Sequence, residues 1–209
     1  MSTLLEAEHL TKIFTQRGKE PFRAVDDVSF SLKAGETLGI VGESGSGKST
    51  LAKLITRLTD ITEGTLKFEG KDITNLKRSQ LKEVYGNIQM VFQNPVGSFD
   101  PRKTLGYGIG ESLRNRNVKK EVDKRVAELL EQCGVDREYA KRYPHEVSGG
   151  QCQRAAIARA LAVEPKVLIC DEATSALDVT IQKQIMELLK ELKEKHGLSF
   201  IFICHNLAL

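Results

Sequence analysis

Short apolar runs and stretches with helical periodicity alternate along most of this chain of 209 residues. Runs of strand length predict buried strands at 37–41, 88–92, 167–170 and 199–204. Apolar residues that recur every three or four positions predict helices at 79–85, 121–133, 148–162 and 180–195. Because strands that alternate with helices form parallel sheets covered by helices, this pattern predicts an α/β fold.

Two regions depart from this alternation. Residues 4–10 and 25–33 alternate apolar and polar positions, which predicts half-buried antiparallel strands, and 65–69 predicts another peripheral strand. From 94 onward, prolines and glycines predict turns and weak helix, and stronger helical periodicity follows. We therefore expect one domain over 1–209, with its core at 1–93 and 165–209 and a mostly helical subdomain at 94–164 inserted between core strands.

A glycine-rich segment follows the predicted strand at 37–41 and precedes helix-forming residues. It reads Gly42, Glu43, Ser44, Gly45, Ser46, Gly47, Lys48, Ser49 and Thr50. This is the spacing G-x-x-x-x-G-K-S/T, and the strand–loop–helix context is the one that a phosphate-binding P-loop needs. Glycines let backbone N–H groups point at phosphate, and the helix that follows adds partial positive charge. The alternative, a chance turn rich in glycine and serine, does not explain the complete spacing.

Composition limits the class of protein. Hydrophobic residues make up 40% of the chain and charged residues 28%, as in soluble globular proteins. The net charge of +3 is small and the basic residues are scattered, so we expect no nucleic-acid partner. No apolar run reaches the roughly 18–20 residues of a membrane span, and no signal peptide is evident. The 4 cysteines form no C-x-x-C pair, which predicts free thiols in a reducing cytoplasm.

Five further motifs stand in a fixed order along the chain. Gln93 ends the strand at 88–92, and an apolar strand delivers Asp171 and Glu172 at 167–172. The others are a Ser-Gly-Gly turn with Ser148, Gly149, Gly150 and Gln151, the run 175–178 ending in Asp178, and His205 after the last strand. Together with the P-loop they resemble the Q-loop, Walker B, signature, D-loop and switch histidine of an ABC transporter nucleotide-binding domain. The resemblance covers nearly the whole chain.

The resemblance implies the fold of a P-loop NTPase of the ABC ATPase type and a reaction, the hydrolysis of ATP with Mg²⁺. Glu172 is then the general base, and Lys48, Gln93 and His205 complete the catalytic set. The implied Mg²⁺ ligands are Ser49, Gln93 and Asp171.

The resemblance also implies that each site is shared between two subunits. The signature residues 148–151 close on the nucleotide that the P-loop of a second ABC ATPase subunit holds, in a homodimer or a heterodimer. Asp178 lies at that interface, or caps a helix that starts near Thr180, or does both. Phe14 is the candidate for stacking on adenine, with a core or edge phenylalanine as an equal alternative.

Finer features resemble one branch of the family, the importers of peptides and nickel. They are 93–102, with its Q-N-P and D-P-R elements, and the runs 142–146, 173–179 and 205–207. The branch implies transmembrane permease subunits, an extracytoplasmic substrate-binding protein, and peripheral attachment to the cytoplasmic face of the cell membrane. Dipeptides, oligopeptides, glutathione, nickel and metallophores all remain open as substrates.

The sequence ends at Leu209, soon after His205, where the family usually continues. We expect a domain truncated at its C-terminus and less stable than a longer relative. Two alternatives to the importer remain. One is a truncated fragment that binds ATP with little hydrolysis. The other is a soluble ABC ATPase outside transport, although such proteins usually carry two cassettes or a long coiled-coil insertion.

Overall fold

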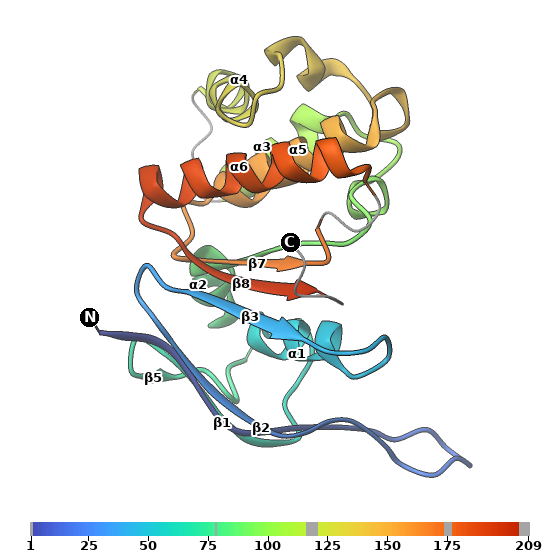
Figure 1. Ribbon diagram of the computed structural model, residues 1–209, viewed down its shortest axis with the longest axis vertical. Helices are drawn as coiled ribbons and strands as arrows, with labels where there is room; N and C mark the ends of the chain where they lie inside the picture. Colours follow the sequence, from blue (N-terminus) through green and yellow to red (C-terminus); the bar gives the residue numbers. More distant parts are fainter. Residues whose placement is uncertain (1, 78, 116–120, 174–176, 205–209) are drawn as a thin grey trace. The chain divides into compact units, whose positions relative to one another are not determined.

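The computed structural model describes residues 2–77, 79–115, 121–173 and 177–204, and its elements form two compact units (Figure 1). The first unit combines Met1–Met90, Lys166–Asp171 and Gly197–Leu209, and the second combines Val91–Pro165 and Glu172–His196. The predicted α/β fold with a parallel sheet, peripheral antiparallel strands and an inserted helical part is confirmed. The predicted domain ranges stay a prediction. By its contacts, α6 (Val179–His196) belongs to the second unit.

The N-terminal half of the first unit forms an antiparallel sheet. Its strands are β1 (Thr3–Phe14), β2 (Phe22–Lys33), β4 (Glu63–Phe68) and β5 (Lys71–Asp72), in the order β2-β1-β4-β5. Each neighbouring pair is antiparallel. Leu5, Leu10, Leu32 and Leu66 of this sheet are fully buried, and β1 departs from strict alternation at the register shift between Ala7 and Leu10.

A second sheet contains the strands that precede the candidate site. They are β3 (Thr37–Val41), β6 (Ile88–Val91), β7 (Val167–Asp171) and β8 (Ser199–Cys204), in the order β3-β8-β7-β6. β8 runs parallel to both β3 and β7. Val41 pairs with Cys204, and Asp171 pairs with Ile203, so these three strands end at the same edge. The P-loop and Asp171 therefore leave the sheet at the same edge, with β8 between their strands.

One strand differs from its prediction. The apolar run at 37–41 predicts a buried strand, but β3 alternates exposed and half-buried residues, and Val41 is 41% exposed. Among the described residues β3 pairs only with β8, at the edge of the sheet, whereas β7 is buried along its whole length. An apolar run therefore identified the strand but not its position in the sheet.

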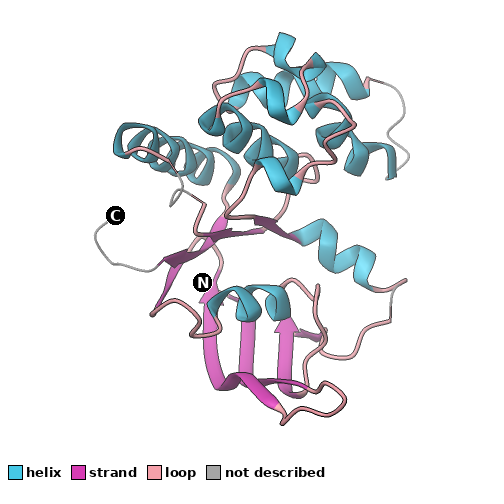
Figure 2. Cartoon of the chain, turned by 90° about the vertical axis from the view of Figure 1, so that its right-hand side faces the viewer, coloured by secondary structure: helices cyan, strands magenta, loops and turns pink. Residues whose placement is uncertain are grey.

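Helix α1 (Lys48–Ile55) packs between the two sheets, contacting β2 of one and β7 of the other (Figure 2). Leu51, Ala52, Leu54 and Ile55 are its buried apolar residues. Burial on both sides explains why so short a helix is stable, because an isolated helix of this length is not. Helix α2 (Leu81–Asn87) leads into β6.

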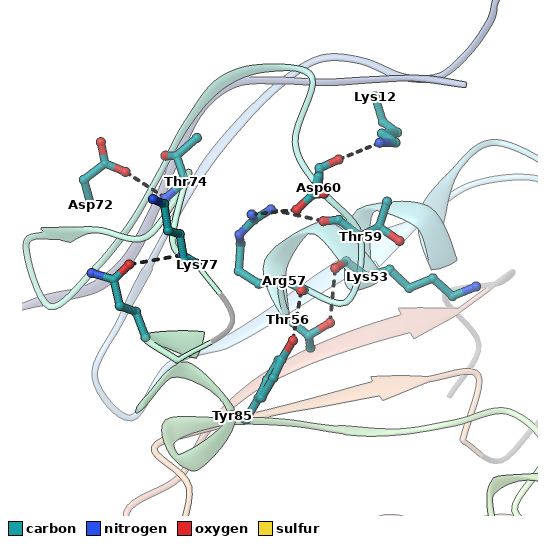
Figure 3. Close-up of polar contacts among 11 residues, drawn as sticks. Lys12, Lys53, Thr56, Arg57, Thr59, Asp60, Asp72, Thr74, Lys77 and Tyr85 are labelled. Atoms are coloured by element: carbon teal, nitrogen blue, oxygen red, sulfur yellow. Dashed lines mark hydrogen bonds and ion pairs between the residues drawn. The ribbon is translucent and has the colours of Figure 1, made fainter. Parts of the chain in front are cut away.

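Polar contacts fasten the C-terminal end of α1 (Figure 3). The buried guanidinium of Arg57 donates to the carbonyl of Thr59 at 3.1 Å and to the carboxylate of Asp60 at 3.1 Å. The Tyr85 hydroxyl donates to the carbonyl of Arg57 at 3.2 Å, and the Lys12 ammonium donates to the carbonyl of Asp60 at 2.7 Å. These contacts tie α1 to β1 and α2, so the helix that begins at the P-loop is held at its other end.

The second unit is largely helical. It contains η1 (Val96–Ser98), α3 (Leu105–Asn115), α4 (Val122–Gln132), η2 (Arg137–Lys141), η3 (Pro144–Glu146), α5 (Gly149–Leu161) and α6. The apolar face predicted for α4 is buried as expected, and α5 is buried over most of its length. No helix among the described residues is long and apolar enough to cross a bilayer.

Helix α3 is more regular than its sequence predicts. Glycines at 106, 108 and 110 predict turns and weak helix, yet 105–115 is one continuous helix. A Cβ at Gly106 would stand 2.7 Å from the carbonyl oxygen of Ala140, and one at Gly108 would stand 2.7 Å from the ring of Phe99. The glycines thus permit close packing, which outweighs a propensity cost of about 1 kcal/mol per glycine.

Candidate functional site

The loop between β3 and α1 packs tightly against β2. Gly45 and Gly47 have φ of +79° and +91°, a region that favours glycine. A Cβ at Gly47 would stand 2.0 Å from the carbonyl oxygen of Ala24, so no other residue fits there without moving β2. Helix α1 begins directly after Gly47, its N-cap. Its first-turn N–H groups lack intrahelical acceptors, as an anion-binding helix start requires.

Lys48 lies across this loop. Its ammonium donates to the carbonyls of Gly42 at 2.8 Å and Glu43 at 2.6 Å, and the residue is only 7% exposed. The loop therefore curls around the cation. A phosphate that enters the curl meets both the ammonium and the N–H groups of α1, and charge-assisted hydrogen bonds of this kind are stronger than neutral ones.

Ser49 and Asp171 bring together two distant parts of the sequence. The Ser49 hydroxyl donates to Asp171 Oδ1 at 3.1 Å, and Asp171 is the last residue of β7, 6% exposed. A hydroxyl and a carboxylate are the hard oxygen ligands that Mg²⁺ takes, usually with water and phosphate oxygens. The donor set therefore fits that ion.

Gln93 and Glu172 meet in the second unit. The Gln93 side-chain amide donates to Glu172 Oε2 at 2.7 Å. Glu172 is 8% exposed and has φ of +47°, which costs a non-glycine residue about 1–2 kcal/mol. A strained residue held by a specific partner is characteristic of functional sites. The amide thus fixes the direction of a carboxylate that follows Asp171 directly in the chain.

The Ser-Gly-Gly turn forms the start of α5. Ser148 is the N-cap: its hydroxyl oxygen accepts from the Gln151 backbone N–H at 3.2 Å, and Gln151 Oε1 accepts from the Ser148 backbone N–H at 2.9 Å. This reciprocal capping box leaves the N–H groups of Gly149 and Gly150 at the open end of the helix. The Gln151 amide also donates to the Tyr139 hydroxyl at 2.8 Å, which fixes its orientation.

The two glycines of this turn face different surroundings. A Cβ at Gly150 would stand 2.9 Å from Ile181 Cγ2 on α6, closer than real Cβ contacts. A Cβ at Gly149 would stand 3.4 Å from Leu177 Cδ2, an ordinary contact. Packing against α6, and not only access to an anion, therefore requires glycine at 150.

We expect Gly150→Ala to lower the free energy of unfolding by about 1–3 kcal/mol, as overpacking does. Gly149→Ala is the matched control and should cost much less. Ile181→Ala removes the atom that clashes. Combined with Gly150→Ala, it should therefore recover the unfolding free energy that Gly150→Ala loses to the clash. Urea denaturation of the four proteins measures this. Equal losses for the two glycine variants would contradict the steric explanation.

Asp178 caps α6. Its carboxylate accepts from the Ile181 backbone N–H at 3.0 Å, and its carbonyl accepts from the Gln182 backbone N–H at 2.9 Å. The capping role that the sequence offered as one possibility is therefore present, and a role at a subunit interface stays a prediction. Ser175 and Ala176 of the predicted D-loop lie outside the described residues, as does His205.

Phe14 is not a core residue. It ends β1, is 45% exposed and pairs in register with the more exposed Phe22. The Lys12 ammonium lies 5.0 Å from the centre of its ring. The structure thus removes the core alternative and leaves an accessible ring at the end of β1, while stacking on adenine stays a prediction.

Three side chains that contact these motifs were not predicted as site residues from the sequence. Tyr139 orients Gln151, Ile181 packs on Gly150, and Ser98 is held by an arginine of α5. No local pattern identifies them, because each acts through a partner that is distant in the sequence.

Cys152 follows the signature residues but is fully buried, and burial raises the pKa of its thiol to about 11, which keeps it protonated at neutral pH.

Three features define a P-loop nucleotide-binding domain. They are a glycine-rich loop with its lysine, a serine–aspartate pair at the end of a parallel sheet, and a glutamate bound by a glutamine. The ABC transporter family model matches residues 25–175. The chain belongs to the ABC transporter family.

Individual relatives agree with this assignment. The chain is 49% identical over 215 residues to the oligopeptide transport ATP-binding protein AppF of Bacillus subtilis, covering 99% of this chain and 65% of AppF. It is 51% identical over 187 residues to the glutathione import ATP-binding protein GsiA of Pectobacterium atrosepticum, covering 88% of this chain and 30% of GsiA. The chain thus spans slightly less than two thirds of AppF and about a third of GsiA.

A solved structure has the same fold. It is the dimeric ATP-binding cassette MJ0796 in a post-hydrolysis state, bound to ADP and Pi. The TM-score is 0.88 at 32% sequence identity, and the match covers 98% of this chain and 89% of that one.

Proposed function

We propose that this chain binds and hydrolyses ATP as a subunit of an ABC importer, working in a dimer. The observation that carries the proposal is the contact between Ser49 and Asp171 at the P-loop, 3.1 Å long. It joins a phosphate-binding loop to a buried carboxylate, which is the combination that an ATP·Mg²⁺ site needs.

In the proposed reaction the P-loop N–H groups and Lys48 bind the phosphates of ATP. Ser49, Asp171 and Gln93 would hold Mg²⁺, which neutralises charge on the phosphates when bound. Glu172 accepts a proton from water as the water oxygen bonds to the γ-phosphorus and the bond to the ADP oxygen breaks. Gln93 keeps the carboxylate of Glu172 aimed, as its 2.7 Å hydrogen bond indicates.

The dimer completes each site in this proposal. The start of α5 offers N–H groups and the Ser148 hydroxyl to an anion, and we assign that anion to the γ-phosphate held by the second subunit. Asp178 lies at the interface, and His205 hydrogen-bonds the γ-phosphate. The similarity to a dimeric cassette bound to ADP and Pi supports this arrangement.

The proposed cargo is an oligopeptide, because AppF is named for oligopeptide transport. Glutathione is the second candidate, since GsiA is named for glutathione import, and nickel remains open from the sequence pattern alone. The partners are transmembrane permease subunits, with a substrate-binding protein outside the membrane and this chain attached at the cytoplasmic face. A fragment with little hydrolysis and a soluble ABC ATPase are the alternatives.

Uptake measurements on cells test the proposal. Cells that lack the gene should lose uptake of a labelled oligopeptide, and the wild-type gene should restore it. Labelled glutathione and ⁶³Ni²⁺ are assayed in parallel to identify the cargo, and purified intact protein is assayed for ATP-dependent phosphate release. Unchanged uptake of all three substrates in the deleted strain would exclude the importer, and absent phosphate release would favour the fragment.

A further inference from the structure

Arg159 lies near the C-terminal end of α5, the helix whose N-terminus carries the signature residues. Its guanidinium donates to the carbonyl of Ser98 and, at 2.9 Å, to the Ser98 hydroxyl oxygen. The same group lies over the ring of Phe99, 4.3 Å from its centre. One arginine thus holds two consecutive residues of a segment that is distant in the sequence.

This arrangement is specific for arginine. Two parallel donors and a planar face are used at once, and lysine offers neither the fork nor the plane. Within the described part of the chain, these contacts of Arg159 are with a carbonyl, a hydroxyl and a ring. Burial lowers the pKa of Arg159, opposed by the charge of Glu111, and an arginine stays protonated nonetheless. A half-buried cation needs polar partners in place of water. The position of Ser98 therefore affects how well the Arg159 guanidinium is solvated.

Ser98 in turn closes a tight turn. Its backbone N–H and its hydroxyl both donate to the carbonyl of Pro95, at 3.2 and 2.7 Å. The side chain of Asn94 accepts from the backbone N–H of Gly97 at 3.0 Å. Residues 94–98 therefore form one small hydrogen-bonded body, with Arg159 at one end and Gln93 at the other.

We propose that Arg159 is a positioning residue for ATP hydrolysis: by holding Ser98 it fixes the turn 94–98 and keeps the Gln93 amide on Glu172. This inference rests on the proposed function. It links two motifs of one chain, because α5 carries Ser148 to Gln151 at its other end. The second subunit would thus contact one end of α5 at the signature residues, while Arg159 near the other end of the same helix helps to align Glu172.

The test is a double-mutant cycle in the intact protein. Arg159→Met keeps an unbranched side chain similar to the aliphatic stem of arginine but removes the donors, so we expect kcat to fall about tenfold, in line with the loss of one charged hydrogen bond. The KM for ATP should stay within about twofold, because the P-loop contacts are untouched. In a Gln93→Ala background, Arg159→Met should have little further effect, since the group that it positions is gone.

Two further variants separate this role from general destabilisation. Ser98→Ala removes the hydroxyl contact but keeps the carbonyl contact, so its loss of kcat should be smaller. Arg102→Met removes an exposed arginine of the same segment, paired with Asp100, and should leave kcat unchanged. If Arg159→Met lowers kcat by the same factor with and without Gln93, the inference is wrong.

Hydrogen exchange provides a readout that does not depend on activity. The amides of 94–99 should exchange faster in Arg159→Met, while those of α4 keep the wild-type rate. Unchanged exchange at 94–99 would overturn the inference even if the wild-type protein hydrolyses ATP. Conversely, faster exchange in a protein that shows no ATP turnover would support the positioning contact and contradict the proposed function.

Discussion

Glu172→Gln is expected to reduce ATP turnover by a factor of about 10²–10⁴ while ATP binding is retained, because general-base catalysis contributes about that much. In the proposed reaction Glu172 accepts the proton of the attacking water, and the substitution replaces it with an amide that cannot accept it. The phosphate-binding loop and the Ser49–Asp171 pair are unaltered. The variant should therefore bind ATP, fail to release phosphate and accumulate as a nucleotide-bound dimer.

The geometry of Glu172 makes this substitution mild for the fold. The residue is 8% exposed and accepts a hydrogen bond from Gln93 at 2.7 Å. A glutamine has the same shape, and its carbonyl oxygen can accept the same bond, although the bond becomes neutral and weaker. We thus expect any loss of stability to be small compared with the loss of turnover.

Phosphate release and size-exclusion chromatography with and without ATP measure the two effects. Glu187→Gln, an exposed position on α6, is the matched control and should behave as wild type. Hydrolysis at the normal rate in Glu172→Gln would show that another group is the base. Loss of both binding and turnover would instead mean that Glu172 supports the site mainly by its charge.

The features that the sequence predicts well are those whose cause is local. A P-loop is read from consecutive residues because the glycines, Lys48 and Ser49 all act within one turn of chain. Alternation in β1 and β2 and the apolar face of α4 reflect single-element periodicity, so their existence is predictable. The position of Glu172 is likewise local, because it follows the strand that ends at Asp171, while its role as general base stays a prediction.

The features that the sequence does not reveal depend on partners far along the chain. An edge strand and a central strand can share one apolar composition, so β3 was expected to be buried. Helix α3 contains glycines because Ala140 and Phe99 approach it. The Tyr139–Gln151 and Arg159–Ser98 contacts likewise join separate elements. Such pairs can be identified only in the folded structure, where the two elements lie together.

Lys48→Ala is expected to weaken ATP binding by about 10–100-fold, equivalent to about 1.4–2.8 kcal/mol, since a charged hydrogen bond to phosphate contributes about this much. Lys48 also donates to Gly42 and Glu43, so its removal loosens the loop before any nucleotide arrives. A fall in stability alone would therefore not prove a role in binding.

The stabilisation that ATP confers separates these two effects. At an ATP concentration 100 times the wild-type Kd, binding raises the unfolding free energy of wild type by about 2.7 kcal/mol. A variant with a 100-fold weaker Kd gains only about 0.4 kcal/mol at that concentration. The difference between unfolding with and without ATP thus reports affinity, because any change in the stability of the empty loop cancels. Lys53→Ala, at an exposed position on α1, is the control and should keep the full gain. An ATP-dependent gain in Lys48→Ala equal to that of wild type would remove Lys48 from the phosphate site.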